Sequence, residues 1–471
     1  MRATITQISF TDLEFSRQGI QLDPVLKQIS DFIDQHAELV EAVRRQLDHG
    51  LKKPQTGRHG LSASQVLRSF ILMRVKNWDY RELAERIADG YTLRQFTQFY
   101  SDTVPKHDAF NRSHNRLTSE TVQLINEAVI QGAVRAGLED GETLRADTTV
   151  TDADIHWPTD ATLLWDTVRV LTRWMQRLHK IVPHEVPRFS NYTRVARRRT
   201  LKLQRMTPTE RERHQTSTYK QLLAITGDVL DDARAVVEAT TTSSGQTLND
   251  TLAIEVLRRQ IADGCALGDR VVDQTRRRVI DGEQVPADQK IFSIFEPHTA
   301  LIKRGKARKP VEFGHKVFLA ETAQGLITQY LVLDGNPSDE DHIQDCLQRH
   351  HATFGYFPDT LATDRGFHSL PNQTWCEEAG IALVCIPQRG GKKTPARETI
   401  EKSPDFKKGQ RFRAGIEGRI SVLFRGRGMK RCLAEGKHGF ELLVGLAVLA
   451  NNLMRIGAMI LENKKPRRRA A

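Results

Sequence analysis

The sequence predicts a mixed α/β protein with long helical segments. After Pro286, short runs with the composition of strands alternate with helix-forming stretches, which is the pattern of an α/β sheet. Before Pro286 the apolar periodicity is almost entirely helical. The exception is the alternating stretch ETLRAD at 142–147, which we interpret as a first strand that a long helical segment separates from the other strands.

The composition indicates a globular protein that binds an anionic partner. The chain has 471 residues, which favours two or three domains. It carries 70 Lys and Arg against 58 Asp and Glu, a net charge of +12, and its pI is about 9.5. Phosphate is the expected partner of such a basic surface.

The sequence excludes several classes of protein. The five cysteines are odd in number and lack CxxC spacing, so neither a disulfide framework nor a zinc knuckle is expected. No signal peptide is recognisable, and no apolar run reaches the roughly 18 residues of a membrane span. We expect a soluble, cytoplasmic protein from a reducing compartment, without membrane contact.

The N-terminal part looks like a helical DNA-binding region. Residues 22–51 have a helical pattern, and Ser62 with Gln65 has the spacing of a capping box. Three short helices follow, the first ending at Gly90 and the next two starting near Thr92 and Asp108, which resembles a helix-turn-helix unit.

The third of these short helices supplies the DNA contacts if that interpretation holds, through Arg112, Asn115 and Arg116. The alternative is a solvated face of an ordinary helical bundle. The segment 161–280 is also helical, and its stretch 173–206, which includes Arg197, Arg198 and Arg199, contains a single glutamate. A DNA-facing patch is favoured there over a solvated hairpin, because the acidic partners for i, i+4 pairs are missing.

The expected elements after Pro286 are the following. The strands are KIFSIFE (290–296), VEFGHKVFLAETAQ (311–324), GLITQYLVLDG (325–335), DTLATDRGF (359–367) and IALVCIP (381–387). The helices are 338–354, 369–380, 411–424 and the apolar, buried 441–461, and the chain ends in a loose basic tail.

Three carboxylates stand where a site is expected. Asp147 ends the first strand, Asp364 ends a later one, and Glu417 lies on a helix whose buried stripe would leave it pointing along the sheet. If they converge, their mutual repulsion favours a divalent cation, and oxygen ligands with open positions suit Mg²⁺ or Mn²⁺. A pair of such ions about 4 Å apart serves phosphodiester chemistry.

Other acids have structural interpretations. Asp334 belongs to a turn, and the acids after Ser338 are interpreted as a helix start. Asp152, Asp154 and Asp160 are expected in a loop.

Several separated motifs resemble one family. The stretches LRADTTVTDADIHWPTDATLLWD, PVEFGHKVFLAET, ATDRGFHS and GIEGRISVLFRGRGMKRC are similar to the DDE transposases of bacterial insertion sequences, most closely the grouping called ISNCY. The helical stretch WDYRELAERIADGYTLRQF is similar to the N-terminal region of the same proteins.

The resemblance implies an RNase H-like core whose metal-binding and catalytic triad is Asp147, Asp364 and Glu417. It implies a transposase that binds terminal repeats and target DNA, with two Mg²⁺ or Mn²⁺ ions, acting as at least a dimer. The expected segments are 1–135 (helical, DNA-binding), 136–160 (first core strand), 161–285 (basic helical insertion), 286–460 (remaining core) and 461–471 (tail).

The glutamate helix departs from the related pattern of Tyr, Arg, Glu and Lys. Arg413 and Glu417 fit, and Arg413 is expected at a phosphate, but Gln410 and Phe424 stand in the Tyr and Lys places. Arg425 or Arg427 is the candidate substitute for the lysine. Trp157 is expected either to stack on an unpaired base or to anchor its loop.

Two other functions stay open on the sequence alone. One is a catalytically inactive, domesticated DNA-binding regulator, and the other is an RNase H-like nuclease that does not join strands.

Overall fold

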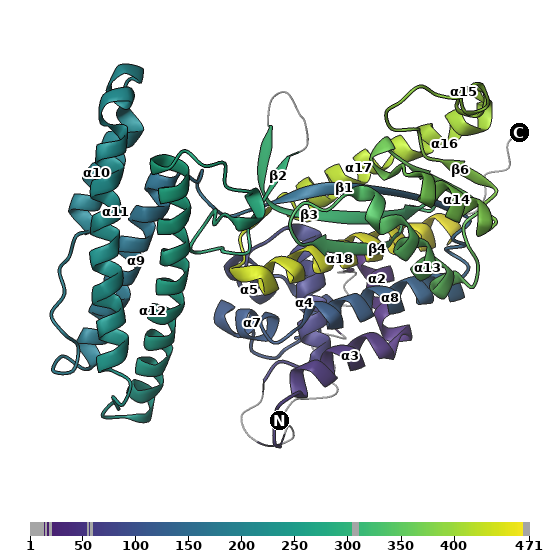
Figure 1. The fold of residues 1–471 in the computed structure, drawn as a ribbon. Helices are drawn as coiled ribbons and strands as arrows, with labels where there is room; N and C mark the ends of the chain where they lie inside the picture. The colour runs from purple at the N-terminus through teal and green to yellow at the C-terminus, as the bar shows by residue number, and fades with distance from the viewer. Residues whose placement is uncertain are drawn as a thin grey trace, which may run out of the picture. The chain divides into compact units, whose positions relative to one another are not determined.

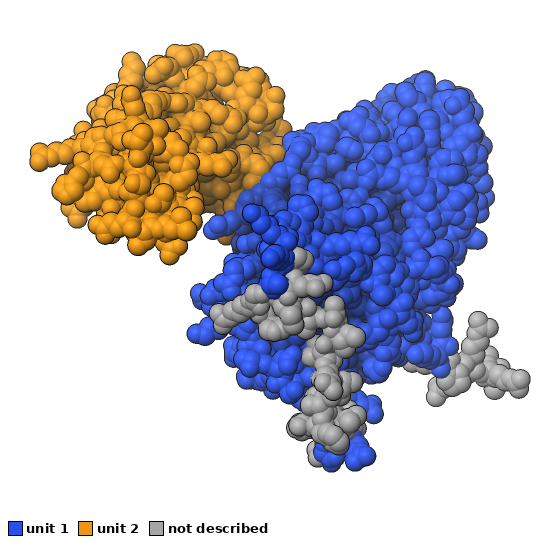
Figure 2. Space-filling view, turned by 90° about the horizontal axis from the view of Figure 1, so that it is seen from below, with its two compact units in different colours: residues 1–152, 315–471 blue, residues 153–314 orange. Residues whose placement is uncertain are grey.

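The computed structural model describes residues 21–53, 60–303 and 310–464, together with Glu14, Arg17 and Thr56. The chain divides into two compact units, residues 1–152 with 315–471 and residues 153–314 (Figure 2). Most of the predicted basic tail lies outside the described residues.

The first unit begins with helices that form as the capping signals predict. The Ser62–Gln65 capping box is present, and Gly90 separates two short helices as expected. The predicted helical region 22–51 is interrupted at His36, whose non-helical backbone ends one helix and starts the next. The helices are α2 (Pro24–Gln35), α3 (Ala37–Asp48), α4 (Ala63–Lys76), α5 (Tyr80–Asp89), α6 (Tyr91–Thr97), α7 (His107–His114) and α8 (Ser119–Arg135).

The sheet has the mixed topology that the resemblance implies. Its strands are β1 (Thr143–Ala153), β3 (Val311–Thr322), β4 (Ile327–Leu333), β5 (Thr360–Thr363) and β6 (Leu383–Cys385), in the order β4-β3-β1-β5-β6 (Figure 1). β1, β5 and β6 are parallel, whereas β4 runs antiparallel to β3. This order is consistent with an RNase H-like DDE domain.

Two further strands were not predicted. β2 (Ala300–Lys303) pairs with residues 311–314 of β3, within the second unit, and β7 (Arg431–Cys432) pairs with β1. The prediction of a strand at 290–296 was wrong, because this segment forms bends and irregular structure.

Helices follow the later strands of the first unit. They are the short η3 (Asp339–His342) and η4 (Arg365–Phe367), and α13 (Ile343–Phe354), α14 (Leu370–Glu378), α15 (Pro395–Lys402), α16 (Pro404–Ala414), α17 (Ile416–Gly426) and α18 (Gly436–Lys464). α15 was not predicted. The expected single helix 411–424 is divided between α16 and α17 at Gly415.

α18 is the central core helix of the first unit. Leu442, Leu449 and Ile456 contribute to the core of the N-terminal helices, and Val444 and Val448 pack with Val317 and other residues of the sheet. Within the described residues it is the one helix long and apolar enough to span a membrane, but 72% of that apolar window is buried inside the protein. It is therefore the buried helix that the sequence predicts.

The second unit is a helical bundle. α9 (Asp160–Ile181), α10 (Thr193–Arg205), α11 (Pro208–Ala239) and α12 (Leu248–Thr275) share one apolar core, and a π-helical turn (Arg276–Ile280) follows. Threonines cap the starts of α9, α11 and α12, each with a reciprocal bond from the residue three positions later. The helical pattern predicted for 161–280 is confirmed.

Candidate active site

The register of two parallel strands brings Asp147 and Asp364 together. β1 pairs with β5 through Ala146 and Thr363, and the next residue of each strand is one of the two aspartates. In a parallel pair, the residues that follow two register partners lie beside each other. The two carboxylates therefore leave the sheet side by side.

Asp147 lies inside its strand rather than at its end. The β-branched run Thr148–Thr151 continues β1 to Ala153, so the expectation that Asp147 closes the strand was wrong. What ends at Ala146 is the pairing with β5. The carboxylate thus belongs to a rigid strand and not to a loop.

Arg413 is the cation that the two aspartates share. Its Nη2 lies 2.8 Å from Asp147 Oδ2 and 3.7 Å from Asp364 Oδ2. Its Nε is buried without a hydrogen-bond partner in the described part of the chain. The guanidinium therefore neutralises one of the two negative charges at most, and its Nε stays without a hydrogen bond in the described chain.

The carboxyl of Asp147 has a raised pKa. The residue is 4% exposed, and burial raises the pKa of its carboxyl to about 6. Arg413 opposes this rise, the charges of Asp364 and Glu417 add to it, and the Thr148 N–H, which donates to Oδ1 at 2.7 Å, opposes it. Such a perturbed carboxyl is a marker of a functional site.

Asp364 caps the short helix after β5. Its Oδ1 accepts a hydrogen bond from the Gly366 N–H at 2.8 Å, while Oδ2 faces Arg413. The side chain is half-buried, which leaves one edge open to solvent.

Glu417 is exposed, in the first turn of α17. The expectation that it points along the sheet was therefore wrong. Its charge still contributes to the raised pKa of Asp147, so the two carboxylates interact. Glu417 lies near the pair but is not packed against it.

Arg145 divides the glutamate helix. Its Nη1 donates to the Phe412 carbonyl at 2.6 Å, and a Cβ on Gly415 would lie 2.3 Å from the same nitrogen. The guanidinium thus occupies the place of a side chain at Gly415 and bonds a carbonyl in the last turn of α16. Arg413 lies in the last turn of α16, and Glu417 lies in the first turn of α17.

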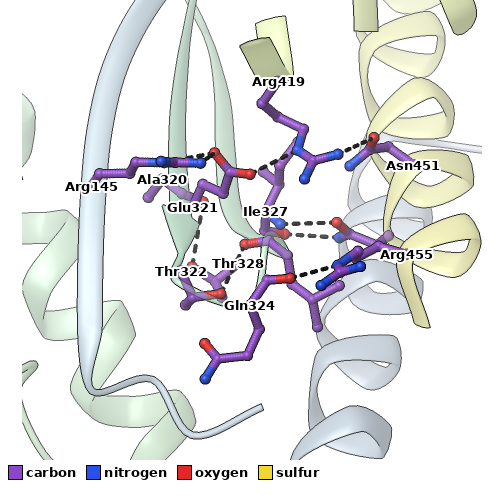
Figure 3. Close-up of polar contacts among 12 residues, drawn as sticks. Arg145, Ala320, Glu321, Thr322, Gln324, Ile327, Thr328, Arg419, Asn451 and Arg455 are labelled. Atoms are coloured by element: carbon purple, nitrogen blue, oxygen red, sulfur yellow. Dashed lines mark hydrogen bonds and ion pairs between the residues drawn. The ribbon is translucent and has the colours of Figure 1, made fainter. Parts of the chain in front are cut away.

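A buried carboxylate fixes α17 to the sheet (Figure 3). Glu321 of β3 is fully buried and accepts from Arg145 Nε at 2.8 Å and Nη2 at 2.7 Å, and from Arg419 Nε at 2.7 Å. Arg145 lies on the strand of Asp147, and Arg419 lies two residues after Glu417. The network therefore connects the elements that carry two of the candidate site residues.

The same network reaches α18 (Figure 3). Arg419 Nη1 donates to Asn451 Oδ1 at 3.3 Å, and Arg455 Nε donates to the Gln324 carbonyl at 2.7 Å. Asn452 accepts from the Ile327 N–H and donates to its carbonyl, at 2.9 and 2.8 Å. These bonds fix the end of β3 and the start of β4 against the core helix.

Gln410 has a structural role at the position where related transposases carry Tyr. Its Nε2 donates to the carbonyls of Thr363 at 3.1 Å and Cys385 at 2.6 Å, at the ends of β5 and β6. It therefore holds α16, and with it Arg413, against the carboxyl ends of these strands.

The donor set suits a hard divalent cation only in part. Asp147 and Asp364 offer the oxygen ligands that Mg²⁺ or Mn²⁺ requires, and both now face the guanidinium of Arg413. Among the described residues, however, no three Asp, Glu, His or Cys side chains are close enough to hold a metal ion together. Glu417 has to turn inward to complete the expected triad.

The candidate DNA-binding arginines of the first unit differ in availability. Arg112 and Arg425 are exposed. Arg116 Nη2 donates to the His49 carbonyl at 3.2 Å, and Arg427 Nη1 donates to the carbonyls of Val75 and Gly426 at 2.9 Å. Arg116 and Arg427 therefore contribute to holding the fold.

In the second unit, Arg197 and Arg198 are exposed and Arg199 is half-buried on α10. Trp157 is 63% exposed and packs edge-on against Phe313, with ring centroids 5.2 Å apart. Asp160 is not a loop residue as expected. It starts α9, and it is buried because it pairs with Arg278 at 2.8 Å.

Asp339, one of the acids after Ser338, was not recognised from the sequence as a site residue. The structure pairs its carboxylate with Lys316 and Thr148, and Ser338 makes no side-chain capping bond within the described chain. Glu321 was also missed. Its signal was a lone glutamate at the end of the apolar run VFLA.

Two family models match the sequence. Residues 273–453 match the transposase DDE domain, and residues 16–116 match a transposase domain (DUF772). Neither match singles out the ISNCY grouping. No curated protein and no solved structure matches the sequence. With both transposase domains in one chain, and the sheet order expected of the catalytic one, this protein belongs to the DDE transposases of insertion-sequence type.

Proposed function

We propose that this transposase binds the ends of an insertion sequence and catalyses metal-dependent DNA strand cleavage and strand transfer. The observation that carries the proposal is the β1–β5 register, which sets Asp147 and Asp364 side by side around one cation. The net charge of +12 supports a nucleic-acid substrate.

Asp147, Asp364 and Glu417 would hold Mg²⁺ or Mn²⁺. Two such ions, when bound, polarise the attacking oxygen and stabilise the leaving one in an in-line displacement at phosphorus. The chain places one of these carboxylates on β1, the second directly after the neighbouring β5 and the third at the start of an anchored helix.

Arg413 acts as a counter-ion in the metal-free protein. Its guanidinium contacts both aspartates, and its buried Nε lacks a partner in the described chain. Once the aspartates are neutralised in another way, the guanidinium is free to turn to a DNA phosphate, for which its fork of donors is well suited.

The DNA contacts are proposed for exposed or half-buried basic side chains and one aromatic ring. Trp157 offers an exposed face for base stacking. The basic residues are Arg112, Arg116, Arg197, Arg198, Arg199, Arg413 and Arg425. Because an insertion sequence has two ends, we propose that the active form is at least a dimer.

The test compares Asp147→Asn, Asp364→Asn and Glu417→Gln with the wild type on duplexes carrying the native ends of the element. Each change should lower strand cleavage about a thousandfold or more while gel-shift affinity for the DNA is retained. The control is Asp334→Asn, since Asp334 is an exposed carboxylate paired with Lys437. Wild-type cleavage by Asp147→Asn in Mg²⁺ would refute the assignment.

The same assays separate the alternative functions. A wild-type protein that shifts the DNA but never nicks it would be a DNA-binding regulator. One that nicks but yields no strand-transfer product in the presence of target DNA would be a nuclease.

A further inference from the structure

Asp339 lies beside the two strand aspartates although it belongs to another part of the chain. It starts η3, the short helix between β4 and α13. Its carboxylate is 20% exposed. It is connected to Asp147 through Thr148, and it lies near Asp364 beside Gly366.

Thr148 joins Asp339 to Asp147. The Thr148 N–H donates to Asp147 Oδ1 at 2.7 Å, and the Thr148 hydroxyl donates to Asp339 Oδ1 at 2.9 Å. One residue of a rigid strand thus fixes the positions of both carboxylates.

Gly366 joins Asp339 to Asp364. A Cβ placed on Gly366 would lie 2.9 Å from Asp339 Oδ2 and 2.9 Å from Asp364 Oδ1, so these two oxygens are at most about 5.8 Å apart. A side chain at position 366 would fill the space between the two carboxylates. The missing side chain allows them to approach.

Lys316 supplies the positive charge for Asp339. The lysine residue is 7% exposed, and its Nζ lies 2.7 Å from Asp339 Oδ1 and 2.7 Å from the Pro337 carbonyl. Asp339 therefore resembles the Asp147–Asp364 pair, because a side-chain cation from the protein contacts the carboxylate in each case.

We propose that Asp339 is a fourth acidic residue of the metal-binding site, with Lys316 as the counter-ion that competes with a divalent cation. This inference rests on the proposed function. The bonds from Lys316 and Thr148 go to Oδ1, while Oδ2 lies at most about 5.8 Å from Asp364 Oδ1. Carboxylates are the ligands that Mg²⁺ and Mn²⁺ bind. Because no three acidic side chains of the described residues are close enough to hold an ion together, binding has to draw these carboxylates closer.

The competing explanation is a purely structural ion pair. A structural pair predicts that Asp339→Asn changes stability but not metal affinity. A ligand role predicts that Asp339→Asn lowers metal affinity more than stability, since Asn keeps the size and one acceptor oxygen but removes the charge.

The experiment measures Mn²⁺ binding to the full-length protein without DNA, by electron paramagnetic resonance of free Mn²⁺. Asp339→Asn should weaken binding at least about tenfold. The matched control is Asp334→Asn, because Asp334 is a lysine-paired carboxylate in the same inter-element loop but is exposed and contacts Lys437 on α18. Wild-type Mn²⁺ affinity in Asp339→Asn would overturn the proposal.

Lys316→Gln gives a second readout that does not depend on the folding of the Asp339 variant. Removing the competing amine should tighten Mn²⁺ binding several-fold, whereas unchanged affinity would contradict the proposal. Asp147→Asn separates this failure from that of the proposed function. If Asp147→Asn loses Mn²⁺ and Asp339→Asn does not, Asp339 alone is wrongly assigned; if neither loses it, both proposals fail.

Discussion

Asp147 and Glu321 are buried carboxylates on the neighbouring strands β1 and β3, yet their surroundings differ. Glu321 is fully buried and accepts three bonds from two arginines. Asp147 has one arginine, which it shares with Asp364, and its pKa is raised to about 6. The charge of Glu321 is therefore satisfied within the fold, whereas the charge of Asp147 is left for a ligand.

The fully paired network and the incompletely paired aspartate are only two residues apart on one strand. Arg145 and Asp147 are two apart on β1, so they lie on the same face of the sheet. Arg145 bonds Glu321 and the Phe412 carbonyl, and thereby positions both the sheet and the glutamate helix. Structural and functional charges are thus adjacent on one strand but have different partners.

The largest expected effect follows from removing the satisfied carboxylate. Glu321→Ala leaves Arg145 and Arg419 without their buried partner, so we expect a decrease of about 3–5 kcal/mol in the free energy of unfolding, measured by urea denaturation. Asp334→Ala, which breaks an exposed pair with Lys437, should cost less than about 1 kcal/mol. Equal decreases in the two variants would contradict the distinction.

The opposite sign is expected at Asp147. A carboxyl whose pKa rises from 3.8 to about 6 on folding makes the folded state less stable once it ionises, by about 3 kcal/mol at most. Asp147→Asn should therefore stabilise the metal-free protein at pH 7. The gain is reduced by the loss of the ion pair between Asp147 and Arg413. A destabilised variant would contradict the prediction.

The free energy of unfolding should also depend on pH through the same residue. The folded state binds the extra proton, so this contribution to stability is present below pH 3.8 and is lost as the pH rises through about 6. Urea denaturation of the wild type in EDTA should show this decrease between about pH 4 and pH 6. Asp147→Asn should show a smaller decrease over the same interval.

An intermediate effect is expected from Gly415, where Arg145 enters the glutamate helix. A Cβ there would lie 2.3 Å from Arg145 Nη1, so Gly415→Ala should displace the arginine and cost about 1–3 kcal/mol. Gly418→Ala is the matched control on α17, since its Cβ meets open space and should stabilise the helix by up to about 1 kcal/mol. Thermal melts of both variants test whether the steric clash or the helix propensity decides.

The smallest expected effects concern exposed cations that serve DNA rather than the fold. Arg197→Gln or Arg198→Gln on α10 should leave stability unchanged, and each phosphate that the variant no longer binds should reduce the log–log salt dependence of DNA affinity by about 0.9. Arg258→Gln is the control, because Arg258 pairs with Glu255 at 2.8 Å within the same unit. A slope equal to the wild type in the α10 variants would remove that helix from the interface.

Local signals predicted the elements well where one interaction dominates. The Ser62–Gln65 box, the Gly90 break and the apolar run of α18 were recognisable because capping, turn formation and burial act within a few residues. Motif order added the sheet topology. The division of α16 from α17 was not predictable, because Arg145 is 267 residues away in the sequence from Phe412, whose carbonyl accepts its hydrogen bond.

The site was predictable as a set of acids but not as a geometry. Asp147 and Asp364 follow from the motifs, yet their shared contact with Arg413 depends on the packing of α16. Asp339 starts the short helix η3, as predicted, but its contacts with Thr148 and Lys316 were not predictable because these partners come from other strands. Glu417 was expected to point along the sheet and is exposed, in the first turn of α17 after the break at Gly415.

The most direct measurement is a crystal structure of the protein soaked in Mn²⁺, with anomalous diffraction to locate the ion. We predict a peak between Asp147 Oδ2 and Asp364 Oδ2, with Arg413 moved away and Glu417 turned inward. An empty space between the aspartates, with Arg413 still bridging them at saturating Mn²⁺, would contradict the assignment of this site.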